Sequence, residues 1–427
     1  MRRGGVWSHK AKATAVIVVI AVCIAVGVTV SGAARLSASK HSAKSSDSRD
    51  AHVSSASQAG AALAAALKFA PAPGATAAAP DSPVVVTAGA GSLLAVRVAT
   101  STGANVPGML TPSANAWEST GALAYGTEYH VRATVVDTSG ARATSTMSFH
   151  TLAPSAVVTA SVFPSDGLSV GVGQPVVFKF SQPITDPAAR ASLLTHLSVD
   201  SSTPVVGGWY WFSDQELHYR PQVFWPPDEQ VTVSADLTGW DAGNGAWGAG
   251  GGTTHFAIGD SHIAYANLVT DKMNVTDNGR TIATYPISGG KPTDPTMDVV
   301  HIVLDRSSVV RMNSATNGVP VNSPDGYDEL VYSDVHISDS GEYVHAAPWS
   351  VNSQGRTNVS HGCINLSPDN AAAFFAFSRV GDVVLVVGSP RPPALGDHGV
   401  MDWDTDWSSF TPANVILPAP STLPGLG

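Results

Sequence analysis

The sequence contains very little cysteine and few charged residues. Of its 427 residues only Cys23 and Cys363 are cysteines, and Cys23 lies within an apolar run near the N-terminus. The rest of the chain therefore holds a single thiol, which excludes an internal disulfide and a zinc site built from cysteines. Charged residues make up 13%, against roughly 25% in ordinary globular proteins. This shortage argues against coiled coils and long charged helices.

Basic charge is scarce as well. The chain has eight lysines, a formal net charge of −10 and no Lys/Arg block beyond its first residues. Because phosphate binding needs a basic face, this excludes nucleic acid as a partner. By contrast, 40 glycines, 29 prolines and a 44% hydrophobic share are typical of β-rich modules with many turns. At roughly 150 residues per domain, the chain has room for about three domains.

The N-terminus predicts export. Residues 13–30 carry no charge, four basic residues precede them, and the first acidic residue is Asp47. As a helix this run would span about 27 Å, which matches a bilayer core. The positive-inside tendency places the residues after it outside the cytoplasm, in the cell envelope. We predict that residues 1–34 are a basic segment with either a membrane anchor or a signal peptide, Ser31-Gly32-Ala33 being the cleavage site in the second case.

Composition then divides the exported part. Residues 35–82 are rich in Ser, Ala and Pro and predict a flexible linker. Period-two runs separated by Gly, Pro and Asn turns predict two immunoglobulin-like β-sandwich modules, at 83–154 and 155–258. The stretch GTEYHVRATVVDTSG in the first is typical of a tyrosine corner. For Trp209–Trp211 in the second, a sandwich core is favoured over sugar stacking, and both modules are expected to act mainly as a spacer.

A third domain is predicted at 259–389. Its strand-like runs alternate with Gly/Asn/Pro loops, and one clear helix, SPDNAAAFFAFSRVG, begins through Ser367-Pro368-Asp369 and ends at Gly381. Residues 390–427 are expected to form a tail packed on this domain. The predicted fold class is therefore mainly β: two immunoglobulin-like modules followed by a β-sandwich domain with one helix.

The chemistry gathers around Cys363. His361 lies two residues before it, His345 lies 18 residues before it, and Gly362 allows close approach of the backbone. A thiol acts as a nucleophile only as the thiolate, which requires a nearby base. The alternative is a buried, inert cysteine. The polar, glycine-containing flanks favour a Cys–His site for acyl transfer.

These residues also carry a family resemblance. His345, followed after 14 residues by Ser360-His361-Gly362-Cys363-Ile364-Asn365, resembles the signature of the YkuD-type L,D-transpeptidase catalytic domain, and the module order resembles actinobacterial members with two immunoglobulin-like domains. The resemblance implies acyl transfer from a peptidoglycan tetrapeptide stem, with release of D-Ala, to the side-chain amine of a diamino acid on a second stem. This reaction forms 3-3 crosslinks. An L,D-carboxypeptidase, a non-catalytic wall-binding protein and a sortase-type enzyme are the alternatives.

The resemblance also implies roles for individual residues. Cys363 would be the nucleophile and His345 the general base, while His361 and Gly362 would line the oxyanion side. The two histidines could exchange roles. Positions that match substrate-binding or orienting residues are Tyr327, Ser340, Gly341, Trp349 and Asn365.

The resemblance implies stem peptides as substrates and β-lactams, carbapenems in particular, as covalent inhibitors, with no cofactor and no metal. Two positions depart from some relatives: Ala346 replaces a serine, and Asn317 replaces an aromatic residue in the lid segment. Two acidic clusters were weighed as calcium sites. Asp402, Asp404 and Asp406 are not followed by a Gly or Glu at calcium-loop spacing. The loop from Asp241 to Asn244 resembles one that holds calcium in a related arrangement, with Asn244 in place of an acid.

Overall fold

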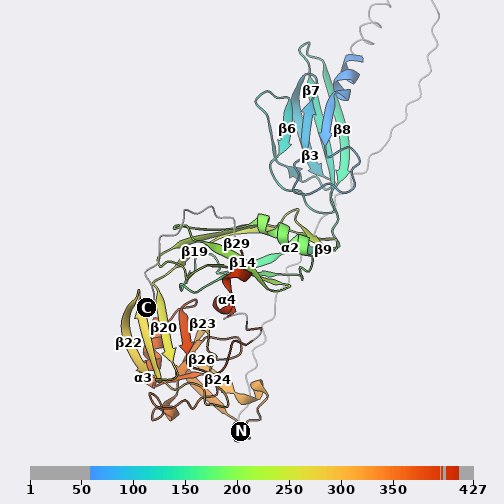
Figure 1. Ribbon diagram of the computed structural model, residues 1–427. Helices are drawn as coiled ribbons and strands as arrows, with labels where there is room; N and C mark the ends of the chain where they lie inside the picture. Colours follow the sequence, from blue (N-terminus) through green and yellow to red (C-terminus); the bar gives the residue numbers. More distant parts are fainter. Residues whose placement is uncertain (1–57, 395, 398–400, 413–427) are drawn as a thin grey trace, which may run out of the picture. The chain divides into compact units, whose positions relative to one another are not determined.

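The computed structural model describes residues 58–394, 396–397 and 401–412, and they form mostly β-strands (Figure 1). The prediction of a mainly β chain is confirmed. The apolar run 13–30 lies outside the described residues, so its expected role as anchor or signal peptide concerns a part that the structure does not describe. Within the described part, no helix has the length and apolar character needed to cross a membrane.

The first module packs two sheets around a common core. Tyr129 is buried there, and its hydroxyl accepts a hydrogen bond of 2.8 Å from the Ala124 N–H, as a tyrosine corner requires. One sheet has the order β1-β2-β6-β5 and the other β4-β3-β7-β8. The strands are β1 Leu67–Ala70, β2 Val85–Ala88, β3 Ser92–Thr100, β4 Asn105–Val106, β5 Gly108–Leu110, β6 Ala116–Ser119, β7 Glu128–Val136 and β8 Arg142–His150.

The predicted linker 35–82 is wrong in its last part. Residues 58–65 are helical, and β1 pairs antiparallel with β2. Leu63 and Leu67 are buried in the core of the first module. Leu63 comes from the helix and Leu67 from the start of β1, so both elements contribute to this core. The first module therefore begins well before the predicted boundary at residue 83.

The second module is a larger sandwich with an aromatic core. Trp209 is 4% exposed and packs against Phe178, with ring centroids 5.7 Å apart. This packing supports the core interpretation of the tryptophan cluster. The sheets have the orders β10-β12-β15-β14-β29, β11-β19-β16-β13 and β17-β18-β9. The elements are β9 Ala156–Val158, β10 Ala160–Phe163, β11 Ser169–Val170, β12 Val176–Phe180, α2 Pro187–Leu193, η1 Leu194–His196, β13 Leu197–Ser201, β14 Gly207–Ser213, β15 Glu216–Pro221, β16 Gln230–Asp236, β17 Asp241–Gly243, β18 Ala246–Gly248 and β19 Gly251–Ile258.

The second module shares its core with the third domain. Ile302 and Val383, both from the third domain, belong to the same buried cluster as the aromatic residues of the sandwich. The backbone N–H of Gly171 donates to the carbonyl of Val380 over 2.8 Å. The expectation that both modules serve mainly as a spacer therefore does not hold for the second one, because removing it would expose apolar surface of the third domain.

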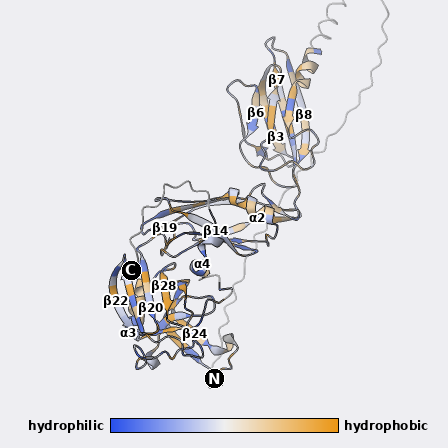
Figure 2. Cartoon of the chain, viewed as in Figure 1, coloured by the Kyte–Doolittle hydropathy of each residue, from blue (hydrophilic) through white to orange (hydrophobic). Residues whose placement is uncertain are grey.

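The third domain is built on two sheets. One has the order β22-β21-β20-β28-β23, in which β20 and β28 run parallel, and the other β24-β25-β26-β27. Figure 2 shows apolar residues along the inner strand β28, which lies between β20 and β23 and contributes Val384 and Val386 to this core. The strands are β20 His262–Asn267, β21 Lys272–Asp277, β22 Arg280–Pro286, β23 Val300–Ile302, β24 Asp305–Asn313, β25 Asp328–His336, β26 Tyr343–Ala346, β27 Ile364–Leu366 and β28 Val383–Val387, with the 3-10 turns η2 Ser314–Asn317 and η3 Pro348–Ser350.

The predicted helix of this domain is present as α3, Pro368–Phe377. Its N-cap is Ser367, whose hydroxyl accepts from the Asn370 N–H, and Pro368 occupies the first turn as expected. The helix ends earlier than Gly381, because Ser378 adopts an extended conformation and its hydroxyl donates to the carbonyl of Phe374. Helix α3 covers the sheet that carries the strands of the candidate site.

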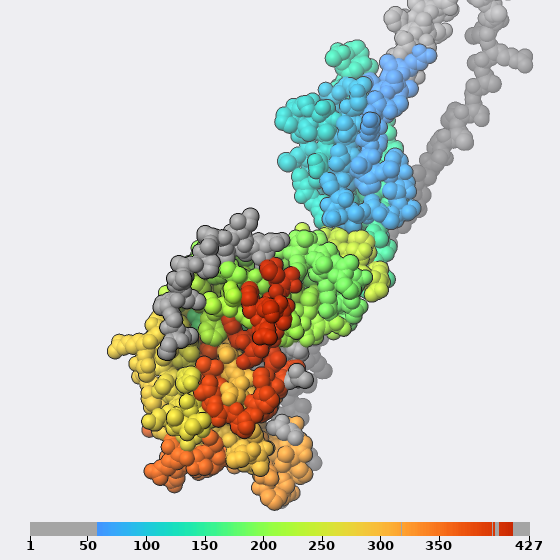
Figure 3. All heavy atoms as spheres, in the orientation of Figure 1, coloured from blue at the N-terminus to red at the C-terminus, as the bar shows by residue number. Residues whose placement is uncertain are grey.

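The C-terminal segment packs on more than the third domain. It contains α4 Met401–Asp404, η4 Trp407–Ser409 and β29 Thr411–Pro412, and β29 pairs with β14 of the second module. Figure 3 shows this segment, coloured red, lying over residues of the second module, coloured green. The Trp403 indole N–H donates to the carbonyl of Gly173 over 2.8 Å. The predicted tail thus connects two domains rather than covering one.

Candidate active site

The sheet β24-β25-β26-β27 brings the two halves of the sequence motif together. His345 lies on β26 directly beside Asn365 on β27, and these strands pair in parallel. Cys363 immediately precedes β27, at the end of a turn that starts at Ser360. Parallel pairing therefore places the residue two positions after Cys363 beside His345, so a spacing of 18 residues in the sequence becomes proximity in the sheet.

The turn is held by one hydroxyl. Ser360 Oγ donates to the Cys363 carbonyl over 2.5 Å and accepts from the Gly362 N–H over 3.1 Å. Gly362 has φ +125°, and a Cβ there would lie 3.3 Å from Glu342 Oε1, so only glycine fits without strain. Because the Gly362 N–H is already used, an oxyanion donor from this turn would have to be the N–H of a flanking residue. In this structure Gly362 shapes the backbone of the turn, and its oxyanion role stays a prediction.

His345 is buried and held in one tautomer. Its Nδ1 lies 3.0 Å from the carbonyl of Ala346 and donates to it, so the unprotonated nitrogen is Nε2. Burial lowers the pKa of His345 to about 4, although the Ala346 carbonyl opposes this. At neutral pH the side chain is a neutral imidazole with a free lone pair, as a general base requires. Since only the carbonyl of residue 346 is used, alanine serves here as well as serine.

Cys363 is partly exposed as a residue, and its thiol is protonated at neutral pH. Burial of the sulfur raises the pKa of Cys363 to about 12, while a backbone hydrogen bond from Tyr343 opposes the rise. The carboxyl groups of Glu342 and Asp334 disfavour the thiolate further. The sulfur therefore needs a base that removes its proton during attack, since a standing thiolate would be unfavourable.

The thiol and the base open into one cavity of about 540 Å³. The His361 ring lies over Tyr327, with centroids 5.1 Å apart, and the half-exposed Trp349 lies 6.2 Å from the ring of His345. Asn365 is held in place by its Nδ2, which donates to Ser350 Oγ over 3.1 Å. All the predicted site residues except Gly362 line the cavity: Tyr327, Ser340, Gly341, His345, Trp349, His361, Cys363 and Asn365.

Three residues of the site escaped the sequence analysis. Arg391 lines the cavity although it lies in the predicted tail. Asp397, also in the tail, accepts from Ser338 Oγ over 2.6 Å and from the Ser340 N–H over 3.2 Å, and so fixes a substrate-side loop. Asp334 lies at an irregularity between β25 and β26, next to Ser333 with φ +57°. The sequence carries no clear signal for these three residues, because two lie in the predicted tail and the third lies at a strand irregularity.

Comparisons with known proteins agree with this geometry. The family model of the L,D-transpeptidase catalytic domain matches residues 261–386, and that of a bacterial immunoglobulin-like domain matches residues 75–241. L,D-transpeptidase 2 of Mycobacterium tuberculosis is 39% identical over 341 residues, which cover 80% of this chain and 83% of the relative. The chain belongs to the L,D-transpeptidase family. It is an enzyme of peptidoglycan crosslinking, and its acyl transfer uses a cysteine nucleophile.

Other relatives of this transpeptidase have the same description. L,D-transpeptidase 5 of Mycobacterium tuberculosis is 32% identical over 371 residues, and this alignment covers 84% of this chain and 78% of the relative. A solved structure of the L,D-transpeptidase LdtMt1 in complex with imipenem is 38% identical, with a TM-score of 0.49, and covers 55% of this chain and all of that one. The prediction of an L,D-transpeptidase with immunoglobulin-like modules is confirmed.

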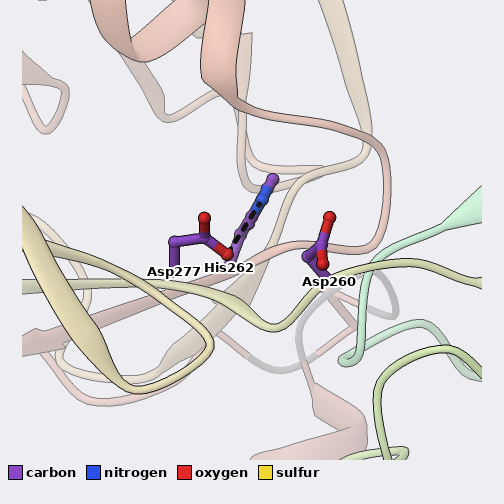
Figure 4. Close-up of side chains that lie close together, drawn as sticks. All are labelled: Asp260, His262 and Asp277. Atoms are coloured by element: carbon purple, nitrogen blue, oxygen red, sulfur yellow. Dashed lines mark ion pairs between the residues drawn. The ribbon is translucent and has the colours of Figure 1, made fainter.

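One group of possible metal ligands lies away from the thiol. Asp260, His262 and Asp277 offer ligand atoms within 4.8 Å of one another, and Figure 4 shows them facing a common space. However, Arg379 Nη2 lies 3.2 Å from His262 Nε2 and 3.7 Å from Asp260 Oδ2. A guanidinium already supplies positive charge there, so we interpret this group as an ion-pair network.

The acidic clusters noted in the sequence also have structural partners. Asp402 binds the His218 ring, Asp404 accepts from the Val300 N–H over 3.1 Å, and Asp241 accepts from the Gly243 N–H over 2.9 Å. These carboxylates cap backbone or bind a histidine individually. Each has a structural explanation that requires no calcium.

Proposed function

We propose that Cys363 attacks the carbonyl carbon of the third residue of a tetrapeptide stem while His345 Nε2 accepts the thiol proton. The tetrahedral intermediate then expels the amine of the terminal D-Ala, which takes the proton from His345. The product is a thioester between the stem and Cys363. What carries this proposal is the placement of a neutral, single-tautomer imidazole on the strand beside the thiol, in one cavity.

The second half-reaction transfers the acyl group. The side-chain amine of a diamino acid on another stem attacks the thioester, His345 removes the amine proton, and the thiol of Cys363 is regenerated. If water attacks instead, the same residues act as an L,D-carboxypeptidase. His361 lies against Tyr327 and lines the side of the cavity where the oxyanion of the tetrahedral intermediate would form. Substrate contacts fall to Tyr327, Ser340, Gly341, Trp349 and Asn365.

The same thiol should react with β-lactams. A relative was solved in complex with imipenem and another with a faropenem-derived adduct. Imipenem and faropenem are β-lactams, and their strained amide carbonyl can be attacked by a thiol, which becomes acylated. This chain has a nucleophile and a base for that step. Carbapenems would therefore inhibit the enzyme by forming a thioester at Cys363.

The N-terminal sequence bears on the compartment in which the enzyme works. Since the substrate lies in the wall, we propose that the enzyme works outside the cytoplasm, with the apolar run 13–30 serving either as a membrane anchor or as a cleaved signal. Mass spectrometry of the N-terminus of protein isolated from the native cell envelope separates the two. An intact N-terminus in the membrane fraction supports the anchor, and a new N-terminus near Ala33 supports cleavage.

The decisive test of function uses purified disaccharide tetrapeptides. We expect 3-3 crosslinked dimers and free D-Ala by mass spectrometry, and no product with Cys363→Ala. Tripeptide monomers without dimers would show that the carboxypeptidase reaction dominates. If the protein forms no product from these stems although its Cys363 thiol is still reactive, the proposed substrate is wrong.

A further inference from the structure

Arg391 extends from the C-terminal segment into the wall of the catalytic cavity. Its Nη1 donates to Glu342 Oε1 over 2.7 Å and to the Pro295 carbonyl over 3.3 Å. Glu342 itself is buried and accepts from the Met297 N–H over 3.0 Å, which fixes the carboxylate in turn. The guanidinium is therefore anchored on one side by a buried carboxylate, and its position does not depend on a bound substrate.

The other side of the guanidinium is free. Both contacts use Nη1, whereas Nη2 and Nε make no hydrogen bond to any residue that the structure describes. One third of the Arg391 side chain is exposed, on the cavity side. Arg311 lines the same cavity but donates through Nε and Nη2 to both oxygens of Asp328, so its fork is already occupied. Arg391 is thus the cavity arginine that keeps donors available for a planar anion.

The guanidinium of Arg391 lies close to the turn that carries the nucleophile. Nη1 of Arg391 is 3.8 Å from the place that a Cβ on Gly362 would occupy, and Gly362 directly precedes Cys363. In a stem that ends one residue after the attacked carbonyl, the terminal carboxylate carbon follows the carbonyl carbon by three bonds, about 3 to 4 Å. An anion at that distance from the attacked carbon falls within reach of the guanidinium, given charge-assisted hydrogen bonds of about 2.8 Å.

We propose that Arg391 binds the terminal carboxylate of the leaving residue of the donor stem, and so selects peptides that end one residue beyond the attacked carbonyl. This inference rests on the proposed donor reaction and adds a specificity-determining residue to it. A longer peptide has no carboxylate at that distance, and a peptide amide has no negative charge there. The salt bridge to Glu342 would orient the guanidinium for this contact.

Glu342 supports the assignment through its charge. Burial raises the pKa of Glu342 to about 7, although Arg391 opposes the rise. Near neutral pH part of the enzyme population therefore has a neutral Glu342, and in those molecules the charge of Arg391 is uncompensated and available to an anion. The other charged or titratable groups near this pair are His301, whose Nε2 is 3.7 Å from Glu342 Oε2, Asp397, and Cys363, whose thiolate Glu342 disfavours.

Thiol labelling tests the contact without any peptidoglycan. The full chain is labelled with 2-carboxyethyl methanethiosulfonate and, in parallel, with its neutral 2-carbamoylethyl counterpart, which place a carboxylate or an amide three bonds from the attacked sulfur. Cys363 attacks that sulfur, methanesulfinate leaves, and the mixed disulfide on the Cys363 peptide is followed by mass spectrometry. The ratio of the two rates cancels differences in thiol acidity between variants.

We expect Arg391→Gln to lower the ratio of anionic to neutral labelling about tenfold, the effect of losing one charge-assisted contact. Arg311→Gln is the matched control and should keep the wild-type ratio. Because Arg391→Gln leaves Glu342 buried without its partner, the double variant Arg391→Gln/Glu342→Gln is measured too and should show the same low ratio. An unchanged ratio in both Arg391 variants would overturn the proposal.

A substrate comparison completes the test. With tetrapeptide stems ending in D-Ala or in D-alaninamide, Arg391→Gln should raise KM for the free acid about tenfold and leave the amide unaffected. Equal KM changes for both stems would contradict the assignment. If no stem is turned over at all, the proposed donor reaction fails, and the labelling ratio still decides whether Arg391 binds an anion beside Cys363.

Discussion

Two buried histidines of this enzyme have opposite electrostatic environments. His345 in the active site and His218 in the second module are 3% and 2% exposed. His345 meets a single backbone carbonyl, and burial lowers its pKa to about 4. Burial lowers the pKa of His218 in the same way. However, Asp402 at 2.9 Å and Glu216 at 2.8 Å outweigh this effect and raise the pKa of His218 to about 9.

The difference shows that partners, rather than depth, decide the charge of a buried histidine. The site that performs chemistry keeps its imidazole neutral, with one nitrogen unprotonated. The site that joins the C-terminal segment to the second module keeps an imidazolium between two carboxylates, where it acts as a charged bridge. One ring is therefore available to accept a proton, and the other is fixed with both nitrogens donating.

The largest effect should come from the nucleophile. Cys363→Ala is expected to abolish crosslinking and carbapenem labelling completely, since the third domain has no second thiol. The fold should be retained, because Cys363 is not a fully buried residue and its side chain borders a cavity. Intact-protein mass spectrometry after carbapenem incubation and a circular dichroism spectrum check both points. A carbapenem adduct on the folded variant would contradict the assignment.

Next in size is loss of the active-site histidine. His345→Ala should slow acylation 10²–10⁴-fold, roughly the contribution of a general base. Because burial raises the pKa of Cys363 to about 12, the residual rate should keep rising through pH 9 instead of levelling off. His361→Ala should lower the rate at every pH and keep the wild-type profile. Stopped-flow carbapenem acylation across pH measures both, and exchanged profiles would show that His361 is the base.

At the other histidine the expected effect is on stability. Asp402→Asn breaks a buried pair and should destabilise the protein by about 3–5 kcal/mol. The pKa of His218 is raised when folded, so its stabilisation is fully present below pH 6.5 and is lost as pH rises through about 9. The difference in denaturation midpoint between variant and wild type should therefore shrink from pH 6 to pH 9.5. A difference independent of pH would show that His218 is uncharged.

The smallest expected effect concerns Asp334, the buried carboxyl beside the thiol. Neither of its oxygens has a hydrogen-bond partner among the described residues, and burial raises the pKa of Asp334 to about 7. From pH 4 to pH 7 the unfolded chain releases this proton while the folded protein keeps it, so stability falls as pH rises. Asp334→Asn should therefore be more stable than wild type at pH 7.5, and close to it at pH 4. Chemical denaturation at both pH values measures this difference in unfolding free energy. If variant and wild type show the same dependence of stability on pH, the Asp334 carboxylate is ionised and solvated in the folded protein.

Much of the fold and of the site followed from short-range patterns in the sequence. The motif from Ser360 to Asn365 has a glycine where the turn needs φ +125°, and Ser367-Pro368 begins the helix that was expected there. Tyr129 identified the corner of the first sandwich through its hydrogen bond to Ala124. Such features depend on residues a few positions apart, so the sequence alone could determine them.

Tertiary structure decided what depends on distant segments. Arg391, Asp397 and Asp402 lie in a stretch that reads as a surface tail. Yet Arg391 lines the catalytic cavity, Asp397 fixes the loop that contains Ser340, and Asp402 pairs with His218. The helix and strand before residue 83 were hidden because Ala-rich segments fold only when a sheet covers their few leucines. The pKa values of His345 and His218 could not be predicted from the sequence either. Burial and charge pairing arise only when segments far apart in the chain pack together, and the local sequence does not record which partners will meet.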